Sequence, residues 1–315
     1  MASFLVTGGA GFIGSHLVRE LLRRRQNVRV LDNLSTGREE NLNGCLARID
    51  LIWGDVRNRR AVRRAVRDID FILHQAALAS VPRSIDDPLE TNQVNVGGTL
   101  NLLQAARDAA VKRFVLASSS SVYGPSPQMP KRESARPEPI SPYAISKFAG
   151  EQYCRVFSQL YGLETVCLRY FNVFGPRQNP ASQYAAVIPK FILALIKGEP
   201  PVIHGDGRQS RDFSYVSNVV QANILACRVP RVSSLVFNVA CGKRYTINEL
   251  STRLSRILGV RDAPIHAAPR PGDVRHSLAD ISRARQLLGY RPDVSFESGL
   301  ERTVAWFKKA LKVSS

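Results

Sequence analysis

The stretch TGGAGFIG, residues 7–14, stands between an apolar run at residues 2–6 and the amphipathic segment SHLVRELLRRR. Its glycines Gly8, Gly11 and Gly14 have the spacing G-x-x-G-x-x-G. Glycine lets a backbone turn tightly and approach a pyrophosphate, and the N-terminus of the following helix offers unpaired N–H groups and the positive end of its dipole. A strand, a glycine turn and a helix in this order predict a dinucleotide-binding unit.

Asp32 ends the second apolar run, NVRVLD, inside the sequence VLDNLSTG. A carboxylate at this point accepts hydrogen bonds from a ribose 2′-hydroxyl and repels a 2′-phosphate, which favours NAD over NADP as the cofactor. The alternative is a glycine turn followed by a solvent-facing aspartate. Asp55, Val56 and the segment HQAA at residues 74–77 follow the next two runs, where adenine and ribose would lie. His74 itself is expected to be a packed, hydrogen-bonded residue.

The first half of the chain alternates β-like runs with segments of helical apolar spacing. The runs are ASFLVT, NVRVLD, IDLIWG, DFILHQA, RFVLASS and ETVCLRY. This alternation predicts an α/β fold with a doubly wound parallel sheet covered by helices on both faces. We assign residues 1–171 to an NAD-binding domain and residues 172–315 mainly to a smaller substrate-binding lobe. We expect this lobe to complete a site without a second independent core, to send some segments back to the first domain, and to contain helices at 188–197, 247–258 and 300–311.

The composition limits the classes of function. With 315 residues, 44% of them hydrophobic, the chain can bury a sizeable core. Most of the net charge of +18 is arginine scattered through helical segments, without the basic tail or aromatic-rich groove of a nucleic-acid-binding protein. We therefore expect no nucleic-acid partner, but a field that attracts anionic substrates. Five widely spaced cysteines without a C-x-x-C pair predict no metal site, and the lack of a leader or a long apolar run predicts a cytoplasmic protein with no membrane partner.

The sequence YAISK places Tyr143 and Lys147 four residues apart near the start of a predicted helix, where they share one face. A phenol has a reference pKa of about 10, which neighbouring positive charges lower, so Lys147 and an oxidised nicotinamide ring would make Tyr143 a base. Upstream, SSSSVYG at residues 118–124 offers hydroxyls that can receive a substrate hydroxyl. A base, a cation, a hydroxyl and a dinucleotide are the parts of an alcohol oxidation.

Taken together, these motifs resemble the extended short-chain dehydrogenase/reductase family, in particular its nucleotide-sugar 4-epimerases. The likeness covers nearly the whole chain. It is carried by TGGAGFIG, LDNLSTG, HQAA, SSSSVYG, YAISK and RYFNVFGP. Further segments are similar to the branch that accepts UDP-N-acetylglucosamine and UDP-N-acetylgalactosamine, namely ALASVPRSIDDP, YAAVIPKFI, HGDGRQSRDFSYV and RPGDVRHSLAD. The resemblance implies a Rossmann-like fold, bound NAD, a UDP-sugar substrate and a homodimer, for which residues 99–110 and 143–161 are the candidate interface helices.

The resemblance also implies roles for single residues. Tyr143 would be the base, Lys147 would lower its pKa and hold the nicotinamide ribose, and Ser119 would bond the reacting sugar hydroxyl. Cofactor contacts are expected from Gly8, Gly11, Phe12, Ile13, Gly14, Asp32, Asn33, Ser35, Thr36, Gly37, Asp55, Val56, Gln75, Ala76, Ala77, Asn95, Tyr143, Lys147 and Tyr170. Substrate contacts are expected from Ser80, Ser119, Ser120, Ser121, Tyr143, Asn172, Ala186, Val187, Val202, His204, Arg211, Arg270, Asp273 and Ser277.

The reaction implied by this resemblance is oxidation at C4, rotation of the 4-keto sugar about its diphosphate linkage, and re-reduction from the other face, with NAD retained throughout. Two residues depart from the glucose-preferring bacterial enzymes. Ser277 stands where they carry a bulky tyrosine, which leaves room for a 2-N-acetyl group without excluding UDP-glucose and UDP-galactose. Ala79 stands where many carry a lysine beside the phosphate, and Ser80 is expected to contribute instead.

Three alternatives stand beside this interpretation. A 4,6-dehydratase would need an Asp–Glu pair where Ser120 and Ser121 stand. A UDP-uronic acid epimerase or decarboxylase is the closer rival, because a carboxylate substrate would also suit a basic protein. The rival from a different class is a non-catalytic NAD- or RNA-binding scaffold, against which the intact Tyr143, Lys147 and Ser119 argue. The relative activity on the different sugars is left open by the sequence.

Overall fold

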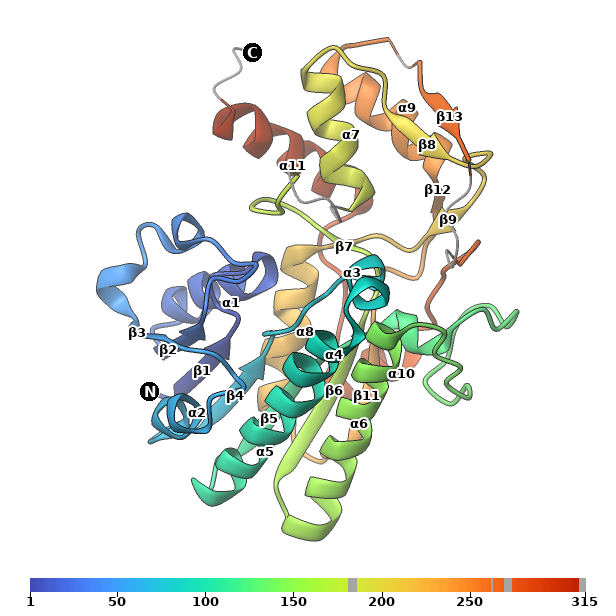
Figure 1. Cartoon of the computed structure of the whole chain (residues 1–315). Coiled ribbons are helices and arrows are strands. Elements are labelled where there is room, and N and C mark those ends of the chain that lie inside the picture. Colours follow the sequence, from blue (N-terminus) through green and yellow to red (C-terminus); the bar gives the residue numbers. More distant parts are fainter. Residues whose placement is uncertain (181–185, 262, 269–273, 312–315) are drawn as a thin grey trace.

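The computed structural model describes residues 1–180, 186–261, 263–268 and 274–311. At its centre lies a seven-stranded sheet in which every pair of neighbouring strands is parallel (Figure 1). From edge to edge the strands are β11 (Leu235–Val239), β6 (Glu164–Tyr170), β5 (Arg113–Ser119), β4 (Phe71–His74), β1 (Ser3–Thr7), β2 (Asn27–Asp32) and β3 (Asp50–Trp53). The predicted doubly wound sheet is confirmed, and each of the six apolar runs of the first half contains one of its strands.

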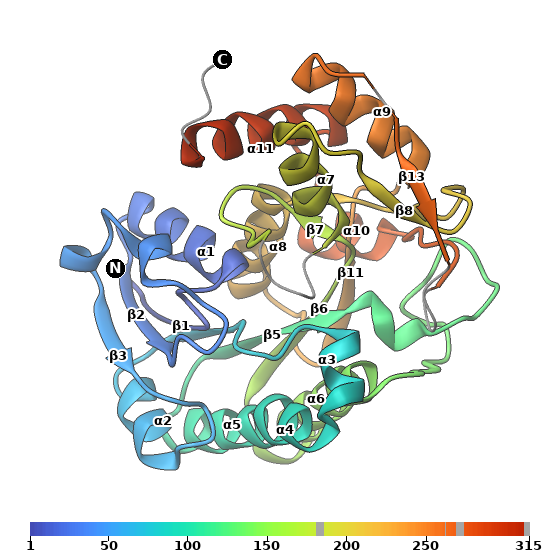
Figure 2. The ribbon, with the colours of Figure 1, turned by 45° about the horizontal axis from the view of Figure 1, so that its top comes forward.

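Helices cover both faces of the sheet, as Figure 2 shows. On one face lie α1 (Phe12–Arg23), α8 (Val216–Arg228) and α10 (Ser282–Leu288), and on the other α2 (Arg59–Val66), α5 (Gly98–Asp108) and α6 (Pro142–Tyr161). Each face has its own buried hydrophobic cluster, one around Leu17 and Val219, the other around Leu103 and Phe157. Burial on both faces explains why the strands read as continuous apolar runs without alternation.

Several short elements follow the carboxyl ends of the strands. They are the 3-10 turns η1 (Glu39–Leu42), η2 (Leu46–Arg48) and η4 (Ser120–Tyr123), the helices α3 (Val81–Asp86) and α4 (Pro88–Asn92), and the π-helical turn η3 (Gln93–Gly97). Single π-turns within helices are frequent at functional sites. The π-turn here leads directly into α5, so it lies between the end of β4 and the helix that covers the sheet.

The helix that carries YAISK begins and ends where its sequence dictates. The hydroxyl of Ser141 accepts a hydrogen bond from the backbone N–H of Ala144, and Pro142 occupies the first turn, where its missing N–H costs nothing. Gly162 ends the helix in the left-handed conformation at a φ of 69°. The predicted helix start is therefore confirmed, and Tyr143 and Lys147 lie in its first two turns.

The second lobe contains the helices α7 (Val187–Ile196), α9 (Ile247–Leu258) and α11 (Phe296–Ala310). Three two-stranded sheets accompany them: β7 (Val173–Phe174) with β10 (Ser214–Tyr215), β9 (Ser210–Arg211) with β12 (Tyr245–Thr246), and β8 (Val202–His204) with β13 (Ile265–Ala267). Helix α11 begins four residues before the predicted start, because Ser295 caps it by accepting from the N–H of Ser298.

This lobe encloses a hydrophobic cluster of its own, formed by residues such as Phe191, Leu250 and Phe307. Our expectation that it would lack an independent core was therefore wrong, because α7, α9 and α11 bury their apolar faces against one another. Other segments from beyond residue 171 return to the sheet. Strand β11 pairs with β6, and α8 and α10 pack on the same face as α1.

Candidate active site

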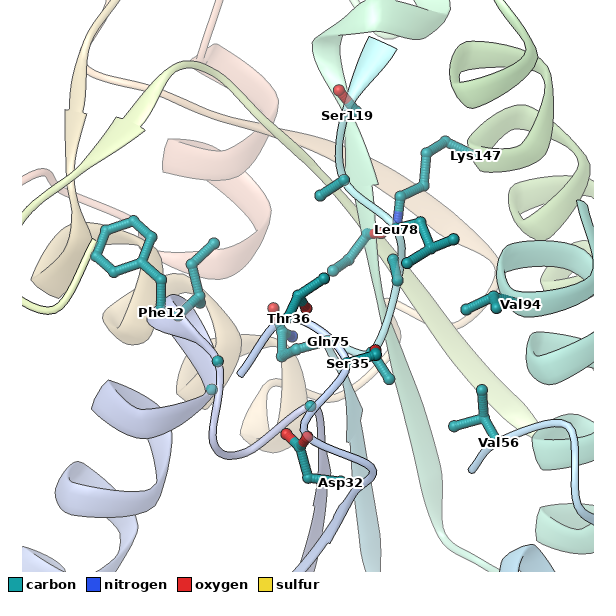
Figure 3. A pocket seen from close by; sticks show the side chains of 18 of the residues that line it. Phe12, Asp32, Ser35, Thr36, Val56, Gln75, Leu78, Val94, Ser119 and Lys147 are labelled. Atoms are coloured by element: carbon teal, nitrogen blue, oxygen red, sulfur yellow. Dashed lines mark hydrogen bonds between the residues drawn. The ribbon is translucent and has the colours of Figure 1, made fainter. Parts of the chain in front are cut away.

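A cavity of about 480 Å³ opens at the carboxyl ends of the sheet strands (Figure 3). The strand order reverses between β1 and β4, and the carboxyl ends on either side of such a reversal form the usual ligand crevice of this fold. The sequence-predicted residues that line it are Gly8, Gly11, Phe12, Ile13, Gly14, Asp32, Asn33, Ser35, Thr36, Asp55, Val56, Gln75, Ala76, Ala77, Ser119, Tyr143, Lys147, Tyr170, Asn172 and Ala186. The structure thus brings together segments spread over nearly two hundred residues of chain.

The glycine turn forms the floor of this cavity. Gly8 has a φ of 68°, and a Cβ there would lie 2.8 Å from the backbone nitrogen of Ala76. A Cβ on Gly14 would lie 2.0 Å from the carbonyl oxygen of Gly8, so any side chain would break the turn. Gly11 is the N-cap of α1, whose first N–H groups face the cavity end of the helix. Bare backbone and a helix N-terminus form a cradle that fits a pyrophosphate.

Asp32 lies at the opposite end of the cavity from Ser119 and Lys147 (Figure 3). Its side chain is buried, and its two carboxylate oxygens accept hydrogen bonds from the N–H groups of Ala10 at 2.9 Å and Leu34 at 2.8 Å. Burial raises the pKa of Asp32, while these backbone hydrogen bonds lower it. The alternative of a solvent-facing aspartate is thus wrong. The carboxylate is held in a fixed position and still has lone pairs that can accept hydrogen bonds from the hydroxyls of a ribose.

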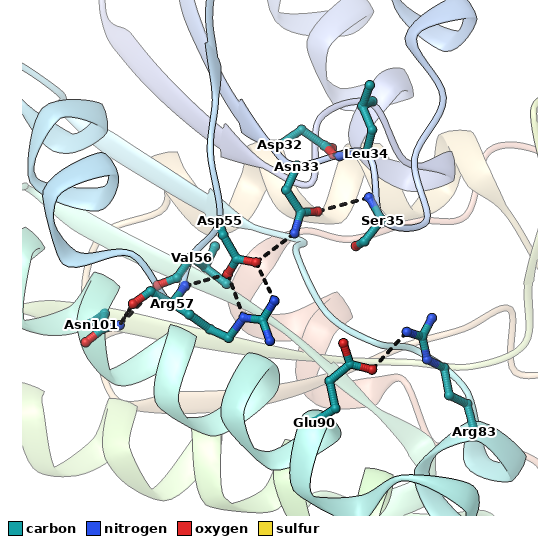
Figure 4. Close-up of polar contacts among 10 residues, drawn as sticks. All are labelled: Asp32, Asn33, Leu34, Ser35, Asp55, Val56, Arg57, Arg83, Glu90 and Asn101. Carbon is teal, nitrogen blue, oxygen red and sulfur yellow. Dashed lines mark hydrogen bonds and ion pairs between the residues drawn. The ribbon is translucent and has the colours of Figure 1, made fainter.

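The rim beside Asp32 is a small polar network (Figure 4). The amide of Asn33 donates to Asp55 at 2.8 Å, and Arg57 forks onto the same carboxylate at 2.7 and 3.0 Å. Hydrogen bonding to Arg57 lowers the pKa of Asp55. Sequence reasoning missed Arg57, although its place two residues after Asp55 is the signal of a local ion pair. The network joins the loop after β2 to the loop after β3.

The base, the cation and the hydroxyl of the predicted constellation lie together at the other end. Lys147 Nζ donates a hydrogen bond of 2.9 Å to the carbonyl of Ala117, and it lies 5.8 Å from the centre of the Tyr143 ring. The side chain of Ser119 lies close enough to the Tyr143 phenol to lower its pKa. The Ser119 oxygen accepts hydrogen bonds from the N–H of Ser121 at 3.2 Å and from its hydroxyl at 3.0 Å. The arrangement can move a proton between the phenol and a hydroxyl bound beside Ser119.

The electrostatics of this group differ from the expectation. Burial raises the pKa of Tyr143, and the hydrogen bond from Ser119 lowers it by less. Burial also lowers the pKa of Lys147 to about 8. We predicted that Lys147 lowers the phenol pKa, but in the protein alone the loss of water around the phenolate outweighs any such effect. Burial of the phenol in this chain therefore disfavours its ionised form.

A second cavity, of about 600 Å³, adjoins the first and shares Asn172, Val173 and Ala186 with it. Four further residues predicted to contact substrate line it: Val187, Val202, His204 and Arg211. Arg211 is held in place by two hydrogen bonds of 3.0 Å from its Nη1 to the carbonyls of Ser210 and Arg275. Val202 is 47% exposed, which leaves an apolar surface open at the mouth of the cavity.

Several predicted residues lie behind the cavity walls. Asn95 clamps the loop that follows β4, because its side chain accepts from the N–H of Leu78 at 2.8 Å and donates to its carbonyl at 3.2 Å. Gly37 packs on the glycine turn, where a Cβ would lie 2.9 Å from the backbone of Ala10. Ser80 caps α3 by accepting from the N–H of Arg83, so its hydroxyl is already engaged.

The remaining predicted substrate residues fall into three groups. Ser120 and Ser121 belong to η4 and are absent from the described linings of both cavities. The N–H of Ser277 donates to the carbonyl of Ser210 at 2.9 Å, which aligns its segment beside Arg211. Arg270 and Asp273 lie outside the described residues.

The cavities also have lining residues that the sequence did not reveal. Leu78 and Val94 form apolar wall in the first cavity (Figure 3), and Lys190, Gln209 and Phe213 line the second. Lys190 follows Val187 by three residues on α7, so helical spacing was a signal for it. The others become neighbours only through the fold.

His74 is a packed residue, as predicted. Its Nδ1 lies 2.7 Å from the hydroxyl of Thr7 and its Nε2 lies 2.9 Å from that of Thr99. The Thr99 hydroxyl donates to the carbonyl of Asn95, so it accepts from Nε2–H, which fixes His74 as the neutral Nε2–H form. Burial lowers the pKa of His74 to about 3, so this imidazole holds strand ends together and takes no part in acid–base chemistry near neutral pH.

Neither a metal-binding cluster nor a membrane-spanning helix is found in the described part of the chain. Within it, no group of three or more histidine, cysteine, aspartate or glutamate side chains is placed to hold a metal ion. None of the helices in the same ranges combines the length and apolar character needed to cross a membrane.

Comparison with known proteins agrees with this geometry. Residues 4–240 match the model of the NAD dependent epimerase/dehydratase family. The structure is similar to UDP-N-acetylglucosamine 4-epimerase from Methanobrevibacter ruminantium M1 in complex with UDP-N-acetylmuramic acid, at 45% identity and a TM-score of 0.94, over 98% of this chain and 99% of that one. It is also similar to UDP-glucose 4-epimerase from Thermus thermophilus in complex with NAD, at 40% identity and a TM-score of 0.89, over 98% and 99% of the two chains.

A relative with a different sugar is similar over the same span. It is UDP-glucuronic acid 4-epimerase from Bacillus cereus in complex with UDP-glucuronic acid and NAD, at 31% identity and a TM-score of 0.91, over 98% of this chain and 99% of that one. The resemblance drawn from the sequence motifs is confirmed by the family match and by the shared fold. The glycine turn, the strand order and the YAISK helix are therefore those of a member of the NAD dependent epimerase/dehydratase family, to which this chain belongs.

Proposed function

We propose that the protein is an NAD-dependent 4-epimerase that interconverts UDP-N-acetylglucosamine and UDP-N-acetylgalactosamine, and also UDP-glucose and UDP-galactose. The observation that carries this proposal is the common wall of the two cavities at Asn172, Val173 and Ala186. A nucleotide diphosphate held in the second cavity directs its sugar across this wall toward Tyr143 and Ser119 in the first.

The residues of the first cavity suit NAD. The glycine turn and the N-terminus of α1 would hold the pyrophosphate, Asp32 would accept hydrogen bonds from the adenosine ribose, and Lys147 would hold the nicotinamide ribose. When bound, NAD supplies the acceptor and the donor of the hydrogen at C4, and its oxidised ring carries positive charge. A nearby positive charge lowers the pKa of a phenol. It would therefore oppose the effect of burial, which raises the pKa of Tyr143.

In the proposed reaction Tyr143 removes the proton from the 4-hydroxyl of the sugar. The hydroxyl of Ser119 is hydrogen-bonded to the oxygen on C4 while the C4–O single bond becomes a carbonyl. The 4-keto sugar then turns about its diphosphate linkage, which stays anchored in the second cavity. Tyr143 returns the proton once the other face of C4 has been reduced, so the phenol is regenerated and no net oxidation takes place.

The second cavity suits the UDP portion. Arg211 offers a guanidinium whose planar donors match phosphate oxygens, and two of its N–H bonds already fix its orientation. Val187 and Val202 offer apolar surface to a nucleobase. The overall charge of +18 favours the approach of a dianionic ligand.

Two features favour a neutral sugar over a uronic acid. Among the described residues that line the first cavity, Lys147 is the single cationic side chain, and its ammonium already bonds the Ala117 carbonyl. A sugar carboxylate would gain little from it. Ser277 is absent from the described linings of both cavities, but its backbone bond to Ser210 places it beside Arg211, where we expect a small side chain to leave room for a 2-N-acetyl group.

We also propose a homodimer that forms through α5 and α6. The outer side of α6 carries apolar side chains in contact with water, with Ile145 54%, Val156 36% and Leu160 70% exposed. Exposed apolar groups in a row along one helix favour burial against a second copy. Sedimentation equilibrium of the purified protein tests this, and a monomer at all concentrations would contradict it.

The proposed activity is tested with purified protein, without added cofactor, and three substrates in parallel: UDP-N-acetylglucosamine, UDP-glucose and UDP-glucuronate. Proton NMR should show formation of the 4-epimer from the first, with slower or equal turnover of the second. Turnover of UDP-glucuronate alone, or release of a pentose product, would favour the uronic acid alternative. Absence of turnover in protein that contains NAD would favour the scaffold.

A further inference from the structure

Three consecutive residues at the end of β5 each contact a different residue of α6. The carbonyl of Ala117 accepts from Lys147 Nζ at 2.9 Å, and the hydroxyl of Ser118 donates to the Glu151 carboxylate at 2.5 Å. The side chain of Ser119 lies close enough to the Tyr143 phenol to lower its pKa. Residues 143, 147 and 151 follow one another at intervals of four, so they lie on one face of the helix. The end of the strand is therefore tied to this face by two hydrogen bonds, to Lys147 and Glu151, and places Ser119 beside Tyr143.

Glu151 is a buried carboxylate that the proposed reaction does not use. Glu151 and Ser118 are 3% and 2% exposed. Arg169 of β6 binds Glu151 through two N–H groups, Nε at 2.8 Å and Nη2 at 2.7 Å. Arg169 is directly opposite Ser118 in the register of the two strands. One carboxylate thus ties two adjacent strands to the helix that carries Tyr143.

The guanidinium that binds Glu151 is itself held in place. It lies 4.6 Å from the ring centre of Tyr123, and the Tyr123 hydroxyl donates to the side chain of Asn238 at 2.7 Å. Asn238 belongs to β11, the next strand of the sheet. A fork of two N–H bonds fixes the plane of the carboxylate, and so the direction from which it can accept the Ser118 hydroxyl.

Stability alone is a weak explanation for such a pair. Removing two charges from water costs roughly as much as their attraction returns, and well-packed apolar side chains of similar volume are often as stable. The pair does provide a directional acceptor at a fixed position. The acceptor, Glu151, lies one helical turn after Lys147. The residue that it holds, Ser118, directly precedes Ser119.

From this geometry we propose that Glu151, oriented by Arg169, is a positioning residue that acts through Ser118 to hold Ser119 against the Tyr143 phenol. The proposal rests on the function proposed above, because Ser119 and Tyr143 are taken as the pair that handles the sugar hydroxyl. It adds a role for Glu151 and Arg169, which are absent from the described linings of both cavities, and for Ser118, which lines the first cavity but directs its hydroxyl to Glu151. Loss of the Ser118–Glu151 contact should misplace Ser119 in the reacting complex while the cavities for NAD and UDP stay intact.

The central variant is Ser118→Ala, which removes the hydroxyl and leaves the ion pair in place. We expect kcat to fall about tenfold, equal to ~1.4 kcal/mol of the barrier, with KM for the UDP-sugar and the content of bound NAD unchanged. Ser118→Thr keeps a hydroxyl and should recover most of the rate. Arg169→Lys keeps the charge but loses the fork, and it should lower kcat to a similar extent. The double variant Ser118→Ala/Arg169→Lys should be no slower than Ser118→Ala or Arg169→Lys alone, because both substitutions act through the same contact.

Thr165→Val is the matched control. The Thr165 hydroxyl is also buried and also ties β6 to α6, through a bond of 2.9 Å to the carbonyl of Cys154, but it lies at the far end of the strand from the cavity. It should lower the melting temperature about as much as Ser118→Ala and leave kcat unchanged. A crystal structure of Ser118→Ala supplies a readout that needs no turnover, and Ser119 should be displaced from the phenol.

The outcomes separate the two proposals. Wild-type kcat in Ser118→Ala, or an unmoved Ser119 in its crystal structure, would overturn the positioning role. Additive losses in the double variant, or a loss of bound NAD in Ser118→Ala, would do the same, since the hydroxyl would then act independently of Glu151. Absence of epimerase activity in the wild type would instead contradict the proposed function, and the displacement of Ser119 would still decide the inference.

Discussion

The two cavities are built in different ways. The first lies on the ends of six strands of one continuous sheet, and its polar side chains are held by neighbouring strand ends, as Asp32 is held by Ala10 and Leu34. The second is assembled from two- and three-residue strands and the start of α7. A site that rests on a sheet tolerates the loss of one contact, whereas a site made of short segments depends on the few ties between them.

One of those ties is Asp212, which follows Arg211. Its side chain is fully buried and accepts hydrogen bonds of 3.0 Å from the N–H groups of Cys241 and Gly242 and of 3.2 Å from Ala279. Burial raises the pKa of Asp212 to about 7, and the backbone hydrogen bonds lower it by less. This single carboxylate joins the strand of Arg211 to the end of β11 and to the segment of Ser277.

The largest effect is expected in the sheet-built cavity. Replacing Tyr143→Phe removes the proposed base and should lower kcat by about 10³-fold, while bound NAD and KM for the UDP-sugar stay near wild type. Tyr153→Phe on the exposed side of the same helix is the control and should be fully active. Near-normal turnover of Tyr143→Phe would show that the chemistry resides elsewhere.

The second prediction concerns the tie in the substrate lobe. Asp212→Asn replaces one accepting oxygen by an N–H donor that faces backbone N–H groups, and it should lower the free energy of unfolding by about 2 kcal/mol. KM for the UDP-sugar should rise while the NAD content stays constant. Asp206→Asn, an exposed carboxylate of the same lobe, should leave both unchanged. If Asp212→Asn weakened the binding of NAD and of the UDP-sugar equally, the two cavities would not be structurally independent of each other.

A third prediction uses the pH dependence of stability in the first half of the chain. The folded pKa of His74, about 3, lies below the unfolded value, so the unfolded chain takes up the proton first and stability falls as the pH drops below about 6.5. Between pH 6.5 and 5 this group alone should remove roughly 1.5 kcal/mol of unfolding free energy. Denaturant titrations of the wild type and of His74→Gln should show a shallower slope in the variant. An unchanged slope would assign the acid sensitivity to other groups, such as His16, whose pKa burial lowers to about 4.

The smallest effect is expected for sugar selection. Ser277→Tyr should lower kcat/KM for UDP-N-acetylglucosamine about tenfold more than for UDP-glucose, because a bulky ring would fill the space for the acetamido group. Paired assays on the two substrates measure the ratio directly. Equal losses would remove Ser277 from the specificity argument and leave it a role in the pairing with Ser210.

The same contrast explains which parts of the molecule could be predicted. The glycine turn, Asp32 and the pair Tyr143 and Lys147 are local patterns, so residues at both ends of the first cavity could be named from the sequence. Val202, His204 and Arg211 were expected through resemblance alone, because nothing in their local sequence brings them together. The ties were not foreseen at all, since a buried Glu151 or Asp212 looks like any surface carboxylate until the fold is known. The raised pKa of Tyr143 was missed for a similar reason: spacing indicates a neighbouring charge but not the depth of burial.

Strand β11 has a consequence for how the molecule can be divided. The chain leaves the sheet after β6, forms α7 and the short strands β7 to β10 of the second lobe, and comes back to add β11 along the edge of β6 before it forms α9 and α11. A protein cut after residue 171 would keep every element of the glycine turn and the YAISK helix, yet β6 would become an open edge with unpaired N–H and carbonyl groups, a template for aggregation. The boundary at residue 171 therefore does not separate two independently folding units. A fragment that is to keep β6 covered must include β11, which ends at Val239.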